Sequence, residues 1–374
     1  MILYRLNRKY FTKFIFNLFI FTIGLNNSIL SQDTLRVPLK FNSIQSALNE
    51  SKNGGIILVE PGTYKENIVW PDKFGIKLIS NGDTSNTIIS GESKSSVLYI
   101  NDNNSKIDSN TLIKGFKFTN GGGVANGGGI FIKNASPKLI NILITKNTST
   151  SNGGGIFFQN SKAMVDQITI SNNLSNVGGA VYQESSNIVA TNLIINNNNA
   201  SSDGGGIYSI YSYSIFKNIS ITNNGAKNRG GGIREHYSTN KYESFIISKN
   251  SGGGWGGGVY TFSSNCNFKN GVIKNNSATL GGGAAFIHPS LNKMDSTDFI
   301  SNSAMEGGGL YVYQCGIDFS NGKIINNSAS SIGGGIWFYD DQIRSTVKNF
   351  TFYKNISKEG AAVSLKTHGC LTSA

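Results

Sequence analysis

Residues 299–311 read FISNSAMEGGGLY and hold one full copy of the pattern that decides the fold. The apolar Phe299 stands three positions before Asn302, the small Ala304 two positions after it, and a glycine triplet begins at Gly307. Such triplets or near-triplets recur every 25 to 27 residues, beginning at Gly127, Gly153, Gly178, Gly204, Gly230, Gly256, Gly281, Gly307, Gly333 and Gly360. This regular spacing indicates that each unit stacks on the preceding one with little room for insertions.

Two further columns repeat in register with the glycines. An asparagine stands five or six residues before each triplet from the second onward: Asn147, Asn173, Asn198, Asn224, Asn250, Asn276, Asn302, Asn327 and Asn355. An apolar residue precedes each asparagine by three positions: Ile144, Ile170, Ile195, Ile221, Ile247, Ile273, Phe299, Ile324 and Phe352. We expect the asparagines to form a ladder, because asparagine tolerates a left-handed bend and its amide can bond to the same residue in the next turn. The apolar residues must then face inward.

The segments between these columns are short runs of β-branched and aromatic residues separated by Gly, Asn and Ser, with no helical period. Each unit is therefore one turn of two or three short strands. We predict an all-β fold, a right-handed parallel β-helix solenoid with about ten regular turns after an N-terminal capping helix.

The chain divides into three predicted segments. Residues 1–31 resemble a signal peptide cleaved near Ser31, because four basic residues precede an apolar stretch at 14–25 that contains no acid. An uncleaved N-terminal anchor is the alternative. Residues 32–120 form the cap and the irregular first turns, with a short amphipathic helix that begins after Ser43. Residues 121–374 form the regular repeats, and the chain stops part way through a turn, as expected of a truncated fragment.

Composition excludes several classes of function. The formal net charge is +12, and removing the four positive charges of residues 1–31 leaves 12 − 4 = +8, spread thinly along the chain. This distribution disfavours nucleic-acid binding and allows a modest attraction to acidic polysaccharide. No segment after residue 31 has 18 consecutive apolar residues, so we predict no transmembrane helix in the mature chain.

Metal and cofactor sites are not indicated by the sequence. The histidines His236, His288 and His368 lack metal-ligand spacing with the cysteines. Three cysteines, Cys266, Cys315 and Cys370, are too few for a disulfide framework. We predict no metal and no cofactor, and calcium would enter only if the protein were a lyase.

Two stretches resemble known families. Residues 43–48, SIQSAL, followed by 54–67, GGIILVEPGTYKEN, look like the opening of pectin-lyase-like β-helix proteins. The repeat is similar to that of chlamydial polymorphic outer-membrane proteins, whose Phe-x-x-Asn hallmark is matched at Phe299 with Asn302 and at Phe352 with Asn355. Together the resemblances cover about residues 41 to 365. The resemblance to the outer-membrane proteins implies an extracellular or surface-exposed adhesin-like protein. The resemblance to the pectin-lyase-like proteins implies a polysaccharide lyase or hydrolase.

An aromatic stripe is the first candidate site. The second residue of the strand after each triplet should face solvent if the first, always apolar, faces inward. These second residues are Phe131, Phe157, Tyr182, Tyr208, Arg234, Tyr260, Ala285, Tyr311, Trp337 and Ser364. Exposed aromatic faces suit sugar rings, so we expect Phe131, Phe157, Tyr182, Tyr208, Arg234, Tyr260, Tyr311 and Trp337 to bind ligand. The alternative is that the rings shield the sheet and stabilise one another.

A charged interruption of the repeat is the second candidate. Arg234, Glu235 and His236 replace the usual aromatic and apolar residues, and Glu184 lies two turns earlier. The backbones of Glu184 and Glu235 should then be about 10 Å apart, near the carboxylate separation of inverting glycosidases. A solvated charge cluster is the alternative, because any two acids on one face of a solenoid can meet that distance.

These observations favour binding over catalysis, since no nucleophile, base and orienting group emerge together. We expect a secreted or cell-surface β-helix protein, extracellular or attached to the outer membrane. It would be adhesin-like or carbohydrate-binding, and its partner a polysaccharide or the surface of a host or neighbouring cell. The alternatives are a polysaccharide lyase or glycoside hydrolase acting on acidic polysaccharide, and a structural spacer.

Overall fold

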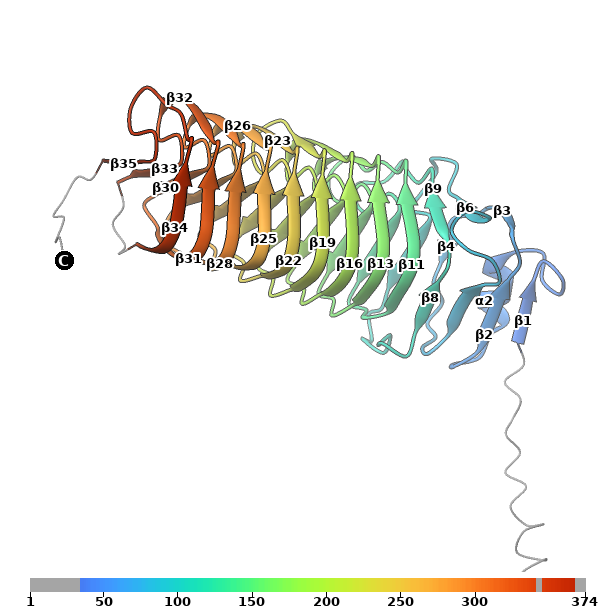
Figure 1. The fold of residues 1–374 in the computed structure, drawn as a ribbon. Helices are drawn as coiled ribbons and strands as arrows, with labels where there is room; N and C mark the ends of the chain where they lie inside the picture. The colour runs from blue at the N-terminus through green and yellow to red at the C-terminus, as the bar shows by residue number, and fades with distance from the viewer. Residues whose placement is uncertain (1–33, 341–344, 367–374) are drawn as a thin grey trace, which may run out of the picture. The chain divides into compact units, whose positions relative to one another are not determined.

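The computed structural model describes residues 34–340 and 345–366, so the predicted signal peptide lies outside the described residues. The described residues from Leu35 onward belong to one compact unit of stacked turns (Figure 1). The predicted parallel β-helix is confirmed, because every strand pairing in it is parallel and joins a turn to the next. No helix among the described residues is long and apolar enough to cross a membrane.

Three parallel sheets run along the stack. The main path of sheet A has thirteen strands, and the turns therefore number about thirteen, of which the first are irregular. Its strands are β1 (Thr34–Val37), β2 (Ile56–Val59), β5 (Lys77–Ser80), β8 (Leu112–Lys114), β11 (Lys138–Thr145), β13 (Met164–Ser171), β16 (Val189–Asn196), β19 (Ile215–Thr222), β22 (Lys241–Ser248), β25 (Asn267–Lys274), β28 (Leu291–Ile300), β31 (Gly316–Ile325) and β34 (Thr346–Tyr353), with β3 (Gly62–Lys65), β6 (Thr87–Ser90) and β9 (Lys117–Thr119) off this path.

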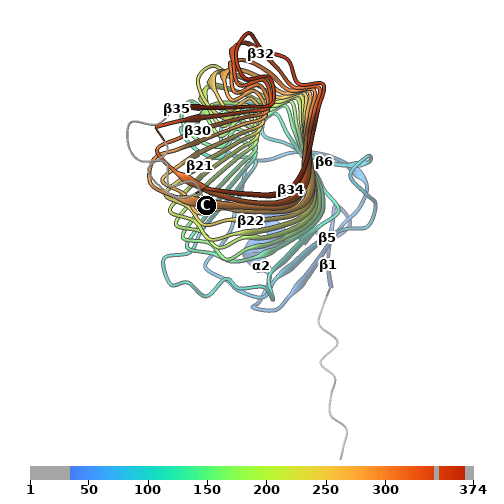
Figure 2. The ribbon, with the colours of Figure 1, turned by 60° about the vertical axis from the view of Figure 1, so that its left-hand side comes forward.

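Sheets B and C complete each regular turn. From β10 onward the strands of sheet B follow the glycine triplets. The sheet contains β4 (Ile68–Val69), β7 (Leu98–Asn101), β10 (Ile130–Lys133), β12 (Ile156–Gln159), β15 (Val181–Glu184), β18 (Ile207–Ile210), β21 (Ile233–His236), β24 (Val259–Phe262), β27 (Ala284–Ile287), β30 (Leu310–Tyr313), β33 (Ile336–Tyr339) and β35 (Val363–Lys366). Sheet C lies between the asparagine ladder and the triplets and contains β14 (Leu174–Val177), β17 (Asn199–Asp203), β20 (Gly225–Ala226), β23 (Ser251–Trp255), β26 (Ser277–Leu280), β29 (Ser303–Glu306) and β32 (Ser328–Ile332). Figure 2 shows the turns one behind another, with β32 in a projecting part of the turn.

The asparagine ladder is present. The amide nitrogen of Asn250 donates to Asn276 Oδ1 (3.0 Å) in the next turn and to the carbonyl of Ile221 (2.9 Å) in the preceding turn. Its own Oδ1 accepts from the backbone N–H of Asn224 (2.9 Å). The same arrangement repeats from Asn147 onward, with the asparagines buried up to Asn327 and Asn355 partly buried, and none of these amides is left unsatisfied.

The first glycine of each triplet makes the tight turn into sheet B. Gly256 has φ of +65°, and a Cβ there would lie 2.3 Å from the carbonyl oxygen of Val259. A side chain is therefore excluded by both the left-handed conformation and the close approach of the backbone. Inside the turns, the first residues of the sheet B strands up to β33 and the apolar residues before the ladder form one continuous core, as predicted, whereas Val363 of β35 is exposed.

The short helix α2 (Ile44–Glu50) begins where the sequence predicts it. Ser43 is its N-cap and accepts a hydrogen bond from the backbone N–H of Ser46, while Ile44, Ala47 and Leu48 are buried. The helix contacts β2 and β4 of the first turns. Its role as a cap of the solenoid stays a prediction.

Candidate functional site

The predicted aromatic stripe exists, but it is buried. Its rings stack turn on turn, with centroids 5.0 Å apart for Phe131 and Phe157 and 5.3 Å apart for Phe157 and Tyr182. Each of Phe157, Tyr182, Tyr208, Arg234, Tyr260, Ala285, Tyr311 and Trp337 is at most 9% exposed, and Phe131 and Ser364 are partly buried. The prediction that these residues face solvent is therefore wrong.

Sheet C is the reason for this burial. Side chains from its strands, such as Val177, Trp255 and Ile332, pack over the stripe as two clusters outside the main core. The ring of Trp255 meets that of Tyr311 edge-on, with centroids 5.5 Å apart. The alternation along each strand was read correctly, because the second residue does point away from the core. A second layer of the same turn covers it.

Arg234 takes one position in the stacked stripe and forms a buried ion pair with Asp203. Its guanidinium lies between the rings of Tyr208 (5.0 Å) and Tyr260 (5.5 Å) and pairs with the Asp203 carboxylate from β17. The side chain of Arg234 is 7% exposed. A flat cation between two aromatic faces continues the stack, so this position is explained by packing.

The two carboxylates proposed as a catalytic pair lie on opposite faces of sheet B. Glu235 is the third residue of its strand and points into the core, where it is fully buried. Glu184 is the fourth residue of its strand, lies outside the core and accepts a hydrogen bond from Gln159 Nε2 (3.1 Å). The strand register pairs Glu235 with Ser209 and aligns Glu184 with His236, so the carboxylates do not face one substrate. The proposed pair was wrong because the two positions differ by one residue in register.

Glu235 instead belongs to a polar patch inside the solenoid. Asn240 Nδ2 (2.8 Å) and the hydroxyl of Tyr242 both donate to its carboxylate. Burial raises the pKa of Glu235 to about 7, although hydrogen bonds from Asn240, Tyr242 and Ser209 act in the opposite direction. Because the side chain is enclosed on all sides, its perturbed pKa bears on stability and not on a reaction with substrate.

His236 is partly buried on the outer side of the same strand. The hydroxyl of Tyr208 lies 3.2 Å from its Nδ1. Burial, and then the positive charge of Arg234, lower the pKa of His236, which favours the neutral imidazole. Glu184, Arg234, Glu235 and His236 thus lie in three different environments and do not converge on a common point.

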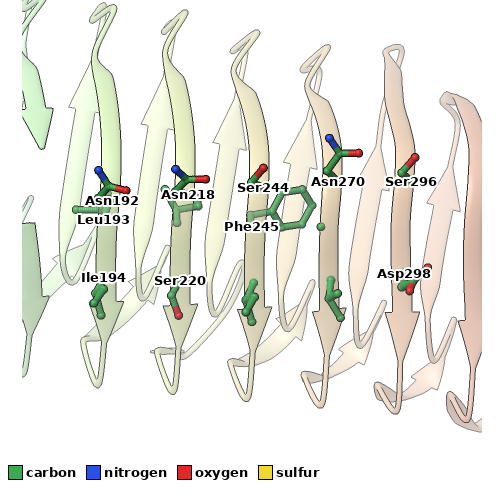
Figure 3. Close-up of a pocket in the computed structure, with 14 residues that line it drawn as sticks. Asn192, Leu193, Ile194, Asn218, Ser220, Ser244, Phe245, Asn270, Ser296 and Asp298 are labelled. Carbon is green, nitrogen blue, oxygen red and sulfur yellow. The ribbon is translucent and has the colours of Figure 1, made fainter. Parts of the chain in front are cut away.

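A groove on the outer face of sheet A is the surface feature that sequence reasoning missed. Nine strands of this sheet bend at one residue in the left-handed conformation, with φ between 50° and 58°: Asn141, Gln167, Asn192, Asn218, Ser244, Asn270, Ser296, Asn321 and Asn349. Across β16, β19, β22, β25 and β28 the bend borders an open hollow of about 740 Å³ (Figure 3). With strands about 4.8 Å apart, the four intervals between these five strands span about 19 Å.

The groove offers hydrogen-bonding groups beside an apolar strip. Within the described part of the chain, the amides of Asn218 and Asn270 make no hydrogen bond to protein, and they project from bends two turns apart, with Ser244 between them (Figure 3). Two residues beyond the bend, Ile194 of β16 is 45% and Ile246 of β22 is 44% exposed. Val272 of β25 is next to Ile246 in register, and Ser220 of β19 stands between the two isoleucines. An extended ligand with both apolar and hydroxyl-bearing faces would meet both kinds of surface.

The charges next to the bend compensate one another. Lys217 pairs with Glu243 (3.1 Å), and Lys269 lies 3.9 Å from Asp295. These four residues stand directly before the bend in successive strands. The charges directly before the bend therefore cancel, and the carboxylate of Asp298, which lines the groove, remains. This balance gives no preference for a strongly acidic polymer.

The signal for this groove was present in the sequence. An asparagine, glutamine or serine stands six positions before each ladder asparagine, for example Asn218 before Asn224 and Ser244 before Asn250. The recurrence of Asn, Gln or Ser at this one register position indicates the left-handed backbone conformation, which short polar side chains such as Asn tolerate best. Metal-ligand clusters of three or more His, Cys, Asp or Glu were not found among residues 34–340 and 345–366.

Comparison with known proteins agrees with the fold. Residues 141–159 match the repeat of the Chlamydia polymorphic membrane proteins. No curated protein matches the chain. The match to the repeat covers 19 residues, part of one regular turn, and includes the bend, Asn147 and the triplet at Gly153.

Solved structures similar to this chain include both enzymes and an adhesin. The A-module of mannuronan C-5 epimerase AlgE4 from Azotobacter vinelandii is 10% identical, with 88% of this chain and 95% of that chain covered and a TM-score of 0.43. A family 28 exopolygalacturonase of Yersinia enterocolitica is 10% identical (90% and 79% covered, TM-score 0.37). The surface adhesin PfbA of Streptococcus pneumoniae is 12% identical (87% and 91% covered, TM-score 0.33). Likeness at this level carries no activity over to this chain.

Proposed function

We propose that this parallel β-helix repeat protein is an exported surface protein that binds an extended, uncharged polysaccharide along the groove of sheet A. The observation that carries the proposal is the row of left-handed bends. In each successive strand the bend presents an amide or hydroxyl side chain, and exposed isoleucines lie beside this row. Similarity to the Chlamydia membrane-protein repeat supports the surface location.

The chemistry of the groove favours a sugar polymer over other extended ligands. Each asparagine amide donates and accepts hydrogen bonds, as sugar hydroxyls do, and the exposed Ile194 and Ile246 suit the apolar faces of sugar rings. The compensated charges of Lys217, Glu243, Lys269 and Asp295 leave no electrostatic reason for a polyanion. Binding would thus rest on repeated weak contacts whose number grows with polymer length.

The experiment replaces amides of the groove without straining the backbone. Glycine adopts the left-handed conformation freely, so the double variant Asn218→Gly, Asn270→Gly removes two amides and keeps the bends. The matched control is Asn141→Gly, Asn349→Gly, two positions of the same column that do not line the groove. Both proteins and the unmodified chain are tested for retention on immobilised dextran, xylan, alginate and polygalacturonate.

The expected result is retention on a neutral polymer, with affinity reduced about tenfold in the groove variant and unchanged in the control. Two lost hydrogen bonds at roughly 0.5–1.5 kcal/mol each account for that factor. Equal binding by both variants, or binding to the acidic polymers alone, would contradict the proposal. Release of soluble products during the assay would instead indicate an enzyme.

A further inference from the structure

Three exposed tyrosines form a surface on the outer side of the turns that lead from sheet B into sheet A. Tyr211 is 57% and Tyr237 46% exposed, and they occupy equivalent positions directly after β18 and β21. Tyr213 is also exposed and stands two residues before β19 begins. None of the three belongs to the buried aromatic stripe, and none lines the groove of sheet A. This tyrosine surface is therefore a separate feature, which packing of the core does not explain.

The backbone at two of these tyrosines is in the left-handed conformation. The φ angle is 50° at Tyr211 and 49° at Tyr237. The other residues of this column are Asn134, Asn160, Ser185, Ser263, His288, Gln314 and Asp340. A bulky aromatic residue is unfavourable in this conformation, whereas short polar residues such as Asn tolerate it. Because both rings are exposed, burial does not offset the strain, and strain of this kind is typical of functional sites.

Tyr211 and Tyr213 each have one open ring face. Tyr237 stacks on Tyr211, with centroids 5.4 Å apart and planes at 5°, and the ammonium of Lys241 lies 5.3 Å from the ring centroid of Tyr213. Both of these contacts come from the following turn. Within the described ranges, no ring or cation from the preceding turn contacts either tyrosine. A flat ligand can therefore continue the stack on that side.

Free polar groups stand beside the open ring faces. The positions equivalent to Tyr211 and Tyr213 in the preceding turn hold Ser185 and Asn187, which are exposed and shorter than a tyrosine. Among the described residues, the Ser185 hydroxyl and the Asn187 amide have no hydrogen-bond partner in the protein. A sugar ring has an apolar face and a rim of hydroxyl groups, so it matches an aromatic face with a hydroxyl and an amide next to it.

The tyrosine surface lies at the start of β16 and β19, two of the strands that form the groove. Five residues separate Tyr213 from the groove amide of Asn218, a distance of at most about 17 Å along an extended strand. Between the two sites, the exposed Val189 pairs with the partly buried Ile215 and provides apolar surface. The groove runs across the strands, whereas Tyr213 and Asn218 are separated along one strand. A linear polymer that follows the groove does not reach the tyrosines, and a side branch does.

We propose that Tyr211 and Tyr213 bind a sugar residue on a side branch of the polysaccharide that lies in the groove. The apolar face of this sugar stacks on an open tyrosine face, and its hydroxyls bond to Ser185 and Asn187. The preferred ligand is then a branched, uncharged polymer. This inference rests on the proposed function, because the branch extends from a main chain that occupies the groove.

The test compares branched polymers with the same polymers after enzymatic removal of their branches. The probes are arabinoxylan and galactomannan, each before and after this treatment, and affinity electrophoresis measures their binding to the full chain. The tyrosine variant Tyr211→Asn, Tyr213→Asn removes both rings and introduces the residue type that the two columns contain at Asn160 and Asn187. Tyr353→Asn is the matched control, because Tyr353 is also exposed and has a lysine ammonium 5.1 Å from its ring centroid.

We expect at least one branched polymer to bind about tenfold more tightly than its debranched form. The tyrosine variant should lose this difference and keep the affinity of the unmodified chain for the debranched form, whereas Tyr353→Asn should bind both forms unchanged. The inference is overturned if the tyrosine variant binds the branched form as the unmodified chain does, or loses affinity equally for both forms. It is also overturned if light scattering shows a dimer for the unmodified chain and a monomer for the tyrosine variant, because a second copy then covers the tyrosines.

Failure of the groove gives a different result. The groove variant Asn218→Gly, Asn270→Gly should lower the affinity for both forms of a polymer, since it acts on the main chain. If it lowers neither, the proposed function is wrong and the branch has no main chain to extend from. If it lowers both while the tyrosine variant lowers neither, the groove binds the polymer and the inference about the tyrosines alone is wrong.

Discussion

Replacing Glu235 by glutamine is expected to remove a pH-dependent loss of stability. Its carboxyl is fully buried, with a pKa of about 7 in the folded protein against an ordinary value of 4.5. Below pH 4.5 the group is protonated in both states, and the folded state carries no buried charge. Between pH 4.5 and about 7 the unfolded chain releases its proton while the folded protein keeps it, so the free energy of unfolding falls as pH rises. Above pH 7 the loss levels off, and the interval corresponds to roughly 3 kcal/mol.

The assay is thermal unfolding followed by circular dichroism between about pH 4 and pH 9. Heating rates must be matched, because large repeat proteins often unfold irreversibly. Glutamine is neutral throughout and keeps the shape, so Glu235→Gln should gain stability relative to the unmodified protein as pH rises from about 4.5 to about 7, and the gain should level off above pH 7. Glu184→Gln removes a carboxylate that lies outside the core and should follow the unmodified protein. The reasoning is refuted if the curves for Glu235→Gln and the unmodified protein stay parallel over the whole range.

Two further substitutions test the repeat itself. Asn250→Ala should lower the free energy of unfolding, measured by chemical denaturation, by roughly 3 kcal/mol or more. The substitution leaves buried backbone and amide groups of both neighbouring turns unpaired. An effect below about 1 kcal/mol would show that the ladder is not a main source of stability. Gly256→Ala should cost about 2 kcal/mol, since its left-handed conformation and the Val259 carbonyl exclude a Cβ. Gly225→Ala, where only the side chain of Asn199 is near, should cost much less, and equal losses would argue against this account of the triplets.

The glycine and asparagine columns were predictable because each is fixed by contacts between identical positions. Asn250 bonds to Asn224 and Asn276, so the same residue type must recur at one spacing, and a single sequence displays that recurrence. The core was predictable for the same reason, since period-2 alternation and the 26-residue repeat together set which residues face inward.

The burial of the aromatic stripe was not predictable in this way. Its cover comes from the column directly before each triplet, which contains Val177, Asp203, Trp255 and Glu306 at equivalent positions. Apolar, acidic and aromatic residues in one column show no pattern of burial. Whether a strand's outer face meets water depends on where sheet C lies, and that is a tertiary property.

The candidate catalytic pair failed on register. Glu184 and Glu235 are two turns apart, as expected, but one residue out of step, which sends their side chains to opposite faces of sheet B. The groove was detectable in principle from the polar column six residues before the ladder. Its meaning depended on knowing that these residues, such as Asn218, bend the strand and remain exposed.

The most direct test of the account is polymer binding by the groove variant Asn218→Gly, Asn270→Gly beside its control Asn141→Gly, Asn349→Gly. Both pairs remove two amides from one structural column, but only Asn218 and Asn270 line the groove. The control pair also removes the hydrogen bond from Asn349 Nδ2 to Asn321 Oδ1 (3.1 Å). We expect the control variant and the unmodified chain to bind a neutral polysaccharide with the same affinity. The groove variant should bind it with an affinity about tenfold lower. Equal retention of the two variants would contradict it.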